Sequence, residues 1–154
     1  MPVTGAVSHI DISVGFSARS IAFYDAFLPA LGFRRWQADL PGFTGEAPER
    51  AAWGLKLAGG AWFGIEVRPA RDDARERRYD RYAPGPHHIA FHAESPAKVD
   101  EVHAVMVAAG AEVLDPPTDY SGQAGYGEGY YAAFYADPDG LKLEVVYEPR
   151  SNPA

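Results

Sequence analysis

The sequence contains no cysteine, which excludes a disulfide framework, a thiolate zinc finger and a thiol nucleophile. It also lacks an apolar run long enough to span a membrane, and its first residues lack the basic and apolar regions of a secretory signal. Basic residues are in the minority, since 14 Lys and Arg stand against 21 Asp and Glu for a formal net charge of −7. We therefore expect a cytoplasmic protein whose partners are neither nucleic acids nor membranes.

Two segments of the chain begin alike and end alike, about 79 residues apart. The first opens with His9 and closes with Glu66, and the second opens with His88 and closes with Glu144. The two His-to-Glu separations are 57 and 56 positions. A duplicated module that places one His and one Glu at matching strand positions can supply four ligands to one metal ion.

The order of predicted elements is the same in both halves. Apolar periodicity gives strand, helix and three strands twice, with residues 1–68 as the first βαβββ module and 86–148 as the second. A charged linker of mixed sign, residues 69–85, joins them, and residues 149–154 form a tail. In the second module, Ser95 caps a helix, and a short strand at 111–114 precedes a loop rich in glycine and proline at 115–129. The fold class is α+β.

Strand alternation places the four repeated residues on faces turned away from the helices. Ile10, Ile12 and Val14 share one face of the first strand, and His9 lies on the other. Glu66 and Glu144 likewise alternate with apolar neighbours on the closing strands. Two imidazoles and two carboxylates suit a divalent ion such as Zn, Ni, Fe, Co or Mn. Because an open sheet face often carries polar residues with no catalytic role, the metal prediction depends on the coincidence of both repeats.

Several motifs resemble those of the vicinal oxygen chelate superfamily, which includes glyoxalase I, extradiol dioxygenases, fosfomycin-resistance enzymes and bleomycin-resistance proteins. The resemblance covers residues 7–147 and is carried by Ser20–Tyr24 with Leu31–Phe33, by His88–Phe91 and by Asp137–Glu144. It implies two tandem βαβββ modules that form a cupped mixed sheet around a central metal site. It also implies a homodimer, because members of the family commonly dimerise.

The resemblance carries the ligand assignment as well. His9, Glu66, His88 and Glu144 match the four-ligand pattern of glyoxalase I, whereas the dioxygenase pattern needs only His9, His88 and Glu144. The favoured function is a metal-dependent, glyoxalase-like lyase or isomerase that acts on a small oxygen-rich substrate through a metal-chelated enediolate. Glu144 is preferred over Glu66 as the base. An extradiol-type Fe(II) dioxygenase and a metal-free protein that binds an aromatic ligand or drug remain alternatives.

Other residues carry weaker signals. His92 shares a strand face with His88 and is predicted to support the metal site or to act as an acid or base, although a solvent-facing His is an equal alternative. Trp62 has the parity of Glu66 and is predicted to line the pocket, with core packing as the alternative. Four tyrosines fit either an aromatic ligand site or ordinary strand composition: Tyr120, Tyr126, Tyr130 and Tyr131. No glutathione-binding set or organic cofactor site is recognised, and the substrate is left open.

Overall fold

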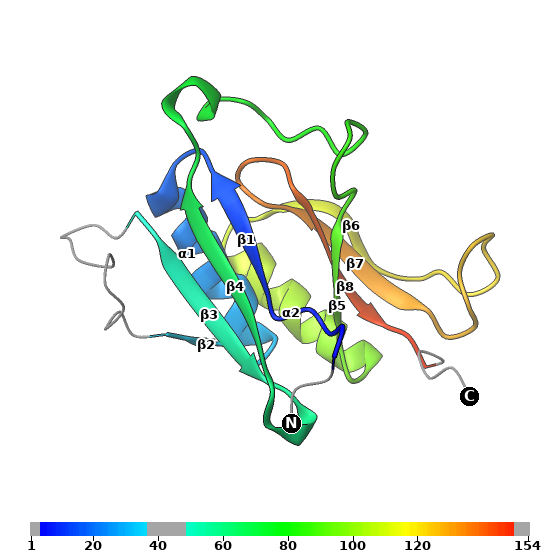
Figure 1. Ribbon diagram of the computed structural model, residues 1–154. Coiled ribbons are helices and arrows are strands. Elements are labelled where there is room, and N and C mark those ends of the chain that lie inside the picture. Colours follow the sequence, from blue (N-terminus) through cyan, green and yellow to red (C-terminus); the bar gives the residue numbers. More distant parts are fainter. Residues whose placement is uncertain (1–3, 37–48, 150–154) are drawn as a thin grey trace. The chain divides into compact units, whose positions relative to one another are not determined.

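The computed structural model describes residues 4–36 and 49–149 of the chain. The chain divides into two compact units, Met1–Arg77 and Arg78–Ala154. Each unit contains a four-stranded mixed sheet and one α-helix longer than a single turn (Figure 1). The predicted α+β fold with two βαβββ modules is therefore confirmed. No helix within the described ranges is long and apolar enough to cross a bilayer.

The first unit has the strand order β1-β4-β3-β2. Its elements are β1 (His9–Val14), α1 (Ser17–Ala30), β2 (Arg34–Arg35), β3 (Ala51–Lys56) and β4 (Trp62–Pro69), with short 3₁₀ turns at Ala58–Gly60 and Asp72–Ala74. β1 pairs parallel with β4, whereas β3 pairs antiparallel with both β4 and β2. Because β1 pairs with β4, the strand that begins at His9 lies beside the strand that contains Glu66.

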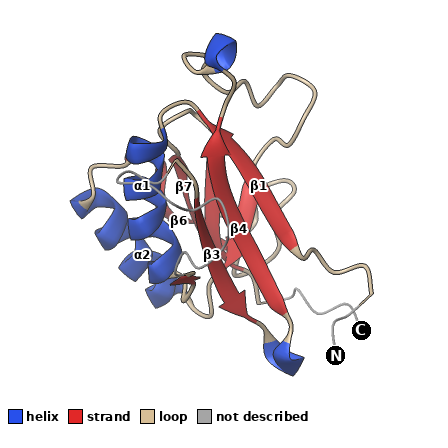
Figure 2. Ribbon diagram, turned by 60° about the vertical axis from the view of Figure 1, so that its left-hand side comes forward, coloured by secondary structure: helices blue, strands red, loops and turns tan. Residues whose placement is uncertain are grey.

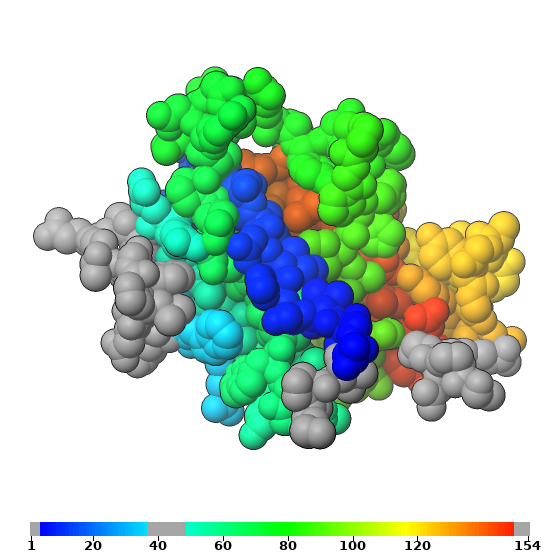
Figure 3. Space-filling model, in the orientation of Figure 1, coloured from blue at the N-terminus to red at the C-terminus, as the bar shows by residue number. Residues whose placement is uncertain are grey.

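Helix α1 covers one face of this sheet and leaves the other open (Figure 2). The core of the unit lies between them, where Ile12, Val14, Ile65 and Val67 are buried with the helix residue Phe27. Strand alternation then turns the intervening residues of β1 to the opposite face, where they are exposed in the blue segment of Figure 3. The predicted division of the first strand into an apolar and a polar face is confirmed.

The second unit repeats this plan with the strand order β5-β8-β7-β6. Its elements are β5 (Ile89–His92), α2 (Pro96–Ala108), β6 (Glu112–Asp119), β7 (Tyr131–Ala136) and β8 (Lys142–Tyr147). Ser95 caps α2 as predicted, because its side-chain oxygen accepts from the backbone N–H of Lys98 at 3.1 Å. Buried Val99, Val102 and Met106 form the core with the strands.

One boundary in the second unit was predicted wrongly. Strand β6 runs to Asp119, so it extends five residues into the predicted loop 115–129 and includes Pro116 and Pro117. Its pairing with β7 shifts register between Val113 and Asp115 and again between Asp115 and Thr118. The two prolines lie between Asp115 and Thr118, at the second register shift of this edge strand. Their lack of a backbone N–H therefore removes no hydrogen bond from the sheet. Most of the predicted tail, residues 150–154, lies outside the described residues.

Candidate functional site

The open face of the first sheet carries the residues that the repeat singled out. In the sheet register His9 lies beside Gly64, and Asp11 lies beside Glu66. On the other side of β4, Gly64 faces Gly54 and Glu66 faces Ala52. One row across the sheet therefore contains His9 and two glycines. The next row on the same face of the sheet contains the carboxylates of Asp11 and Glu66. Because the glycines have no side chains, the sheet surface is low along their row.

A hollow of about 260 Å³ lies over this row, and we call it the Gly64 hollow. Its lining includes His9, Asp11, Trp36, Trp62, Gly64 and Glu66. Trp62 lines the hollow together with Glu66 and is 47% exposed. Trp36, just after β2, lies in the same wall, and no pattern in the sequence had indicated this.

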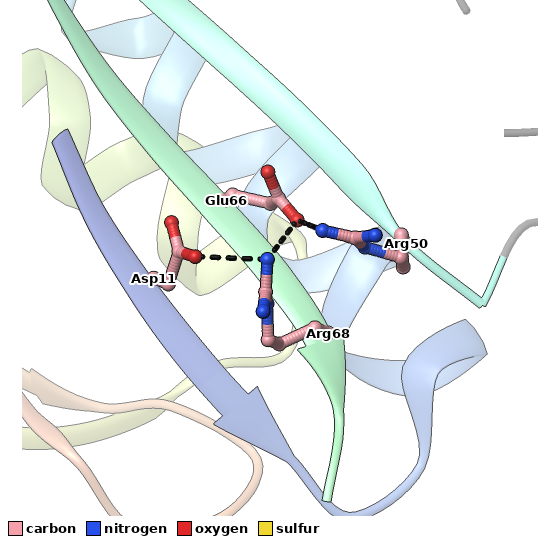
Figure 4. Close-up of polar contacts among 4 residues, drawn as sticks. All are labelled: Asp11, Arg50, Glu66 and Arg68. Atoms are coloured by element: carbon pink, nitrogen blue, oxygen red, sulfur yellow. Dashed lines mark hydrogen bonds and ion pairs between the residues drawn. The ribbon is translucent and has the colours of Figure 1, made fainter. Parts of the chain in front are cut away.

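Glu66 is held by two arginines on this face (Figure 4). Its Oε1 accepts from both Nε (2.9 Å) and Nη2 of Arg50 and from Nη2 of Arg68 (3.0 Å). The same nitrogen of Arg68 lies 2.9 Å from Oδ2 of Asp11, so two cations and two anions form one balanced network. The second oxygen of Glu66 points away from both arginines (Figure 4). The carboxylate is thus fixed through one oxygen and presents the other.

These contacts keep Glu66 ionised. Burial alone would raise the pKa of Glu66, but the hydrogen bonds and charges of Arg50 and then Arg68 outweigh it and lower the pKa below its usual value. Glu66 is therefore a permanent anion at neutral pH, which suits a ligand or an electrostatic anchor better than a proton acceptor.

The second unit holds its glutamate differently. Glu144 on β8 is 2% exposed, and its Oε2 lies 3.0 Å from Nε2 of His88, which directly precedes β5. Its Oε1 accepts a hydrogen bond from the hydroxyl of Tyr130. The repeat residues His88 and Glu144 are therefore in direct contact within one unit. Nδ1 of His88 lies 2.8 Å from Nδ1 of His87, which fixes the orientation of the ring.

Tyr130 belongs to an aromatic cluster that covers Glu144. Tyr126 lies with its ring centroid 4.8 Å from that of Tyr130, and Tyr120 stacks on Tyr126 at 5.0 Å and meets Phe134 edge-on at 5.9 Å. Burial, followed by the hydrogen bond to Glu144, raises the pKa of Tyr130 well above its usual value. The phenol therefore remains a proton donor to Glu144 across the neutral range.

The residues of the second unit fit a divalent cation. Two ligands that each lie about 2.1 Å from one ion at right angles are about 3.0 Å apart, which is the separation of the nitrogen of His88 and the oxygen of Glu144. The tyrosine hydrogen bond on the remaining oxygen is the kind of outer contact that orients a ligating carboxylate. In the first unit, the exposed His9 and the outward oxygen of Glu66 offer one donor each.

The four-residue ligand set remains a prediction. Among residues 4–36 and 49–149, no three His, Asp or Glu side chains stand close enough together to form a metal centre. The set takes two residues from each unit, and the structure brings together the pair His88 and Glu144. His92 is exposed on β5, in register with Val146, and its supporting role is also a prediction.

Sequence reasoning missed three side chains that hold the glutamates. Arg68 lies two positions after Glu66 on the same strand face, so strand parity could have found it. Arg50 and Tyr130 directly precede β3 and β7, each next to the strand that carries the glutamate, and the sequence does not show which residues lie opposite each other across these pairs. Their contacts with the glutamates depend on tertiary structure, which the alternation of residues along a strand does not describe.

Comparison with known proteins gives a family match over most of the chain. Residues 6–145 match the model of the Glyoxalase/Bleomycin resistance protein/Dioxygenase superfamily. The uncharacterised protein YqjT of Bacillus subtilis (strain 168) is 32% identical over 138 residues, which cover 90% of this chain and 95% of YqjT.

Solved structures share the architecture. A "putative glyoxalase" from Bacillus halodurans is 27% identical, with a TM-score of 0.69 and coverage of 93% of this chain and 96% of that one. A glyoxalase/dioxygenase from Nostoc punctiforme has a TM-score of 0.66 at 18% identity, covering 95% and 92% of the two chains, and shows the fold alone.

Proposed function

The chain belongs to the Glyoxalase/Bleomycin resistance protein/Dioxygenase superfamily, and on that premise we propose that it is a metal-dependent, glyoxalase-like lyase or isomerase. Its ligands would be His9, Glu66, His88 and Glu144, and its substrate a small molecule with oxygens on neighbouring carbons. The ion, when bound, would act as a Lewis acid toward those oxygens.

The contact between His88 and Glu144 carries this proposal. A buried carboxylate beside an imidazole, 3.0 Å apart, supplies two donors already at the separation of adjacent ligands. A buried acidic side chain is costly unless it is paired, so a pair in this position calls for a functional or structural reason. The outward oxygen of Glu66 supports the proposal because the arginines orient the carboxylate without covering that oxygen (Figure 4).

The protein's own groups would divide the remaining work. Glu66, held as an anion by Arg50 and Arg68, would bind and orient. Glu144 would accept a proton from a carbon beside a carbonyl group and return it to the neighbouring carbon. Tyr130 would hold the second oxygen of Glu144 so that the accepting oxygen stays aimed, and the aromatic cluster would exclude water around that group.

Metal binding by the purified full chain tests the proposal. Metal-free protein titrated with Zn²⁺, Ni²⁺, Mn²⁺ and Co²⁺ in a calorimeter should bind one ion per chain. His88→Ala should lower the affinity by at least tenfold. His103→Ala serves as the matched control, because His103 lies on α2 and contacts Tyr135 instead of Glu144. Equal affinities of the wild-type chain and His88→Ala would rule out the proposed site.

An extradiol-type Fe(II) dioxygenase is a second candidate, and the arginine contacts of Glu66 favour it. The two guanidinium groups occupy Oε1 and leave Glu66 one oxygen for a metal ion, and the dioxygenase pattern does not need Glu66. Glu66→Gln separates the two candidates. Lower metal affinity and loss of hydrogen exchange beside a carbonyl group would support the lyase or isomerase. Unchanged metal affinity with catechol-dependent oxygen uptake under Fe(II) would support the dioxygenase.

A further inference from the structure

Two exposed tryptophans lie beside the Gly64 hollow at an angle to each other. The rings of Trp36 and Trp62 have centroids 6.3 Å apart and planes inclined at 59°. They are 43% and 47% exposed, although indole is among the side chains that gain most from burial. Because the two indole rings are tilted and close, they cannot sandwich a planar group between them. Together they form a corner that can contact the face and the edge of an aromatic ring on a ligand.

The position of Trp36 is built into the sheet. A Cβ on Gly54 would lie 2.7 Å from Nε1 of Trp36, so the indole can lie against β3 only because that residue is glycine. The backbone N–H of Trp36 donates to the carbonyl oxygen of Ala52 at 3.0 Å, which continues the β2–β3 pairing and fixes the ring over Gly54. A glycine inside a strand often marks the close approach of another group.

Gly64 gives the hollow its depth. It faces Gly54 across the β3–β4 pair, and a Cβ there would lie 3.4 Å from Cβ of His9. A methyl group at this position would stand in the floor without an impossible clash. The hollow, about 260 Å³, is smaller than a site for a whole drug-sized ligand, so it fits one ring with small substituents.

We propose that the Gly64 hollow is a subsite for a single planar aromatic ring, held in the corner formed by Trp36 and Trp62. The inference rests on the proposed function in taking this ring as part of the substrate, since His9 and Glu66 line the same hollow. Ring binding itself needs no metal ion. An aromatic ring gains from both indoles through offset or edge-on contacts, whereas a saturated ring of similar size gains only from burial.

The experiment uses the full chain treated with EDTA and labelled with ¹⁵N. The chain has three tryptophans, so a heteronuclear spectrum reports three indole N–H signals. Trp53 is an internal control, because it is fully buried and its Nε1 donates to Asp25 at 3.0 Å. The probes are benzyl alcohol and its saturated counterpart cyclohexylmethanol. We expect benzyl alcohol to shift the Trp36 and Trp62 signals, but not that of Trp53, with a dissociation constant on the order of 1 mM.

Variants test the hollow itself. Gly64→Ala fills the floor and Trp36→Leu removes one wall, so each should weaken benzyl alcohol binding at least fivefold. Gly127→Ala is the matched control, because its added Cβ would meet nothing within 4 Å. Cyclohexylmethanol should bind at least threefold more weakly to the unaltered chain. Equal binding of the two probes, equal shifts of all three indole signals, or no effect of either variant would overturn the proposal.

The outcome is separable from that of the metal proposal. Benzyl alcohol binding is measured on the unaltered chain without metal, and metal binding is measured without benzyl alcohol, so each result stands by itself. Loss of metal binding with retained ring binding would refute the proposed function alone. Normal metal binding without ring binding would refute the aromatic subsite alone.

Discussion

Replacing Tyr130 with phenylalanine removes one oxygen from the structure and leaves Glu144 with one fewer donor. Glu144 is 2% exposed, so water cannot replace the lost hydrogen bond without rearrangement of the cluster. A hydrogen bond to a charged group contributes about 1.5–3 kcal/mol, and removing one partner of a buried group leaves its desolvation cost uncompensated. Because His88 still contacts the other oxygen, we expect Tyr130→Phe to lower the free energy of unfolding by about 2 kcal/mol.

Thermal and urea unfolding would measure the effect. For a chain of 154 residues, about 2 kcal/mol corresponds to a fall in Tm of about 4–8 °C. Tyr131→Phe is the matched control, because the hydroxyl of Tyr131 donates to the carboxylate of Asp100 at 2.9 Å but in an exposed setting. Its loss should cost about 0.5 kcal/mol or less. Equal stability of Tyr130→Phe and Tyr131→Phe would show that Tyr130 does not stabilise the buried carboxylate of Glu144. It would also contradict the proposal that Tyr130 positions Glu144.

Two pH-dependent predictions follow from the groups around the glutamates. The lowered pKa of Glu66 contributes stability that is fully present above about pH 4.5 and lost as the pH falls through the folded-state pKa, so Glu66→Gln should lower Tm by about 2–4 °C at pH 7 and by less as acidity increases. A gap between wild type and variant that grew in acid would contradict this. The raised pKa of Tyr130 contributes stability that is fully present below about pH 10 and lost as the pH rises above it. The difference in unfolding free energy between wild type and Tyr130→Phe should therefore shrink between pH 10 and 12, as urea titrations at fixed pH would show.

The strands and their faces could be predicted from the sequence because each depends on a short, strong signal. Alternation along β1 assigns Ile12 and Val14 to the core and His9 to the open face whatever the rest of the chain does. The turn residues after Ala136 fixed the last hairpin, since Asp137 accepts from the backbone N–H groups of Asp139 and Leu141. These are local effects, so one sequence was enough.

The Gly64 hollow could not be predicted, because it depends on register. Gly54 and Gly64 face each other only in one pairing of β3 with β4, in which Lys56 lies opposite Trp62. A slip of one residue would move the two glycines into different rows and turn every side chain of the slipped strand to the other face. The glycine pair at 59–60 lies between the two strands and fits more than one hairpin loop length, so the sequence alone does not determine which residues are neighbours.

The way in which the two glutamates are held gives a reason to separate their roles, which the sequence could not do. A base must bind a proton readily near neutral pH, and a carboxylate with a lowered pKa does so poorly. Glu66 is in that state because Arg50 and Arg68 stabilise its anion. Glu144 instead accepts a hydrogen bond from the hydroxyl of Tyr130 and faces the imidazole of His88. A proton on Glu66 would leave the guanidinium groups of Arg50 and Arg68 facing a neutral acid. The charges of these partners therefore support the proposal that Glu144 is the base and Glu66 an anchor.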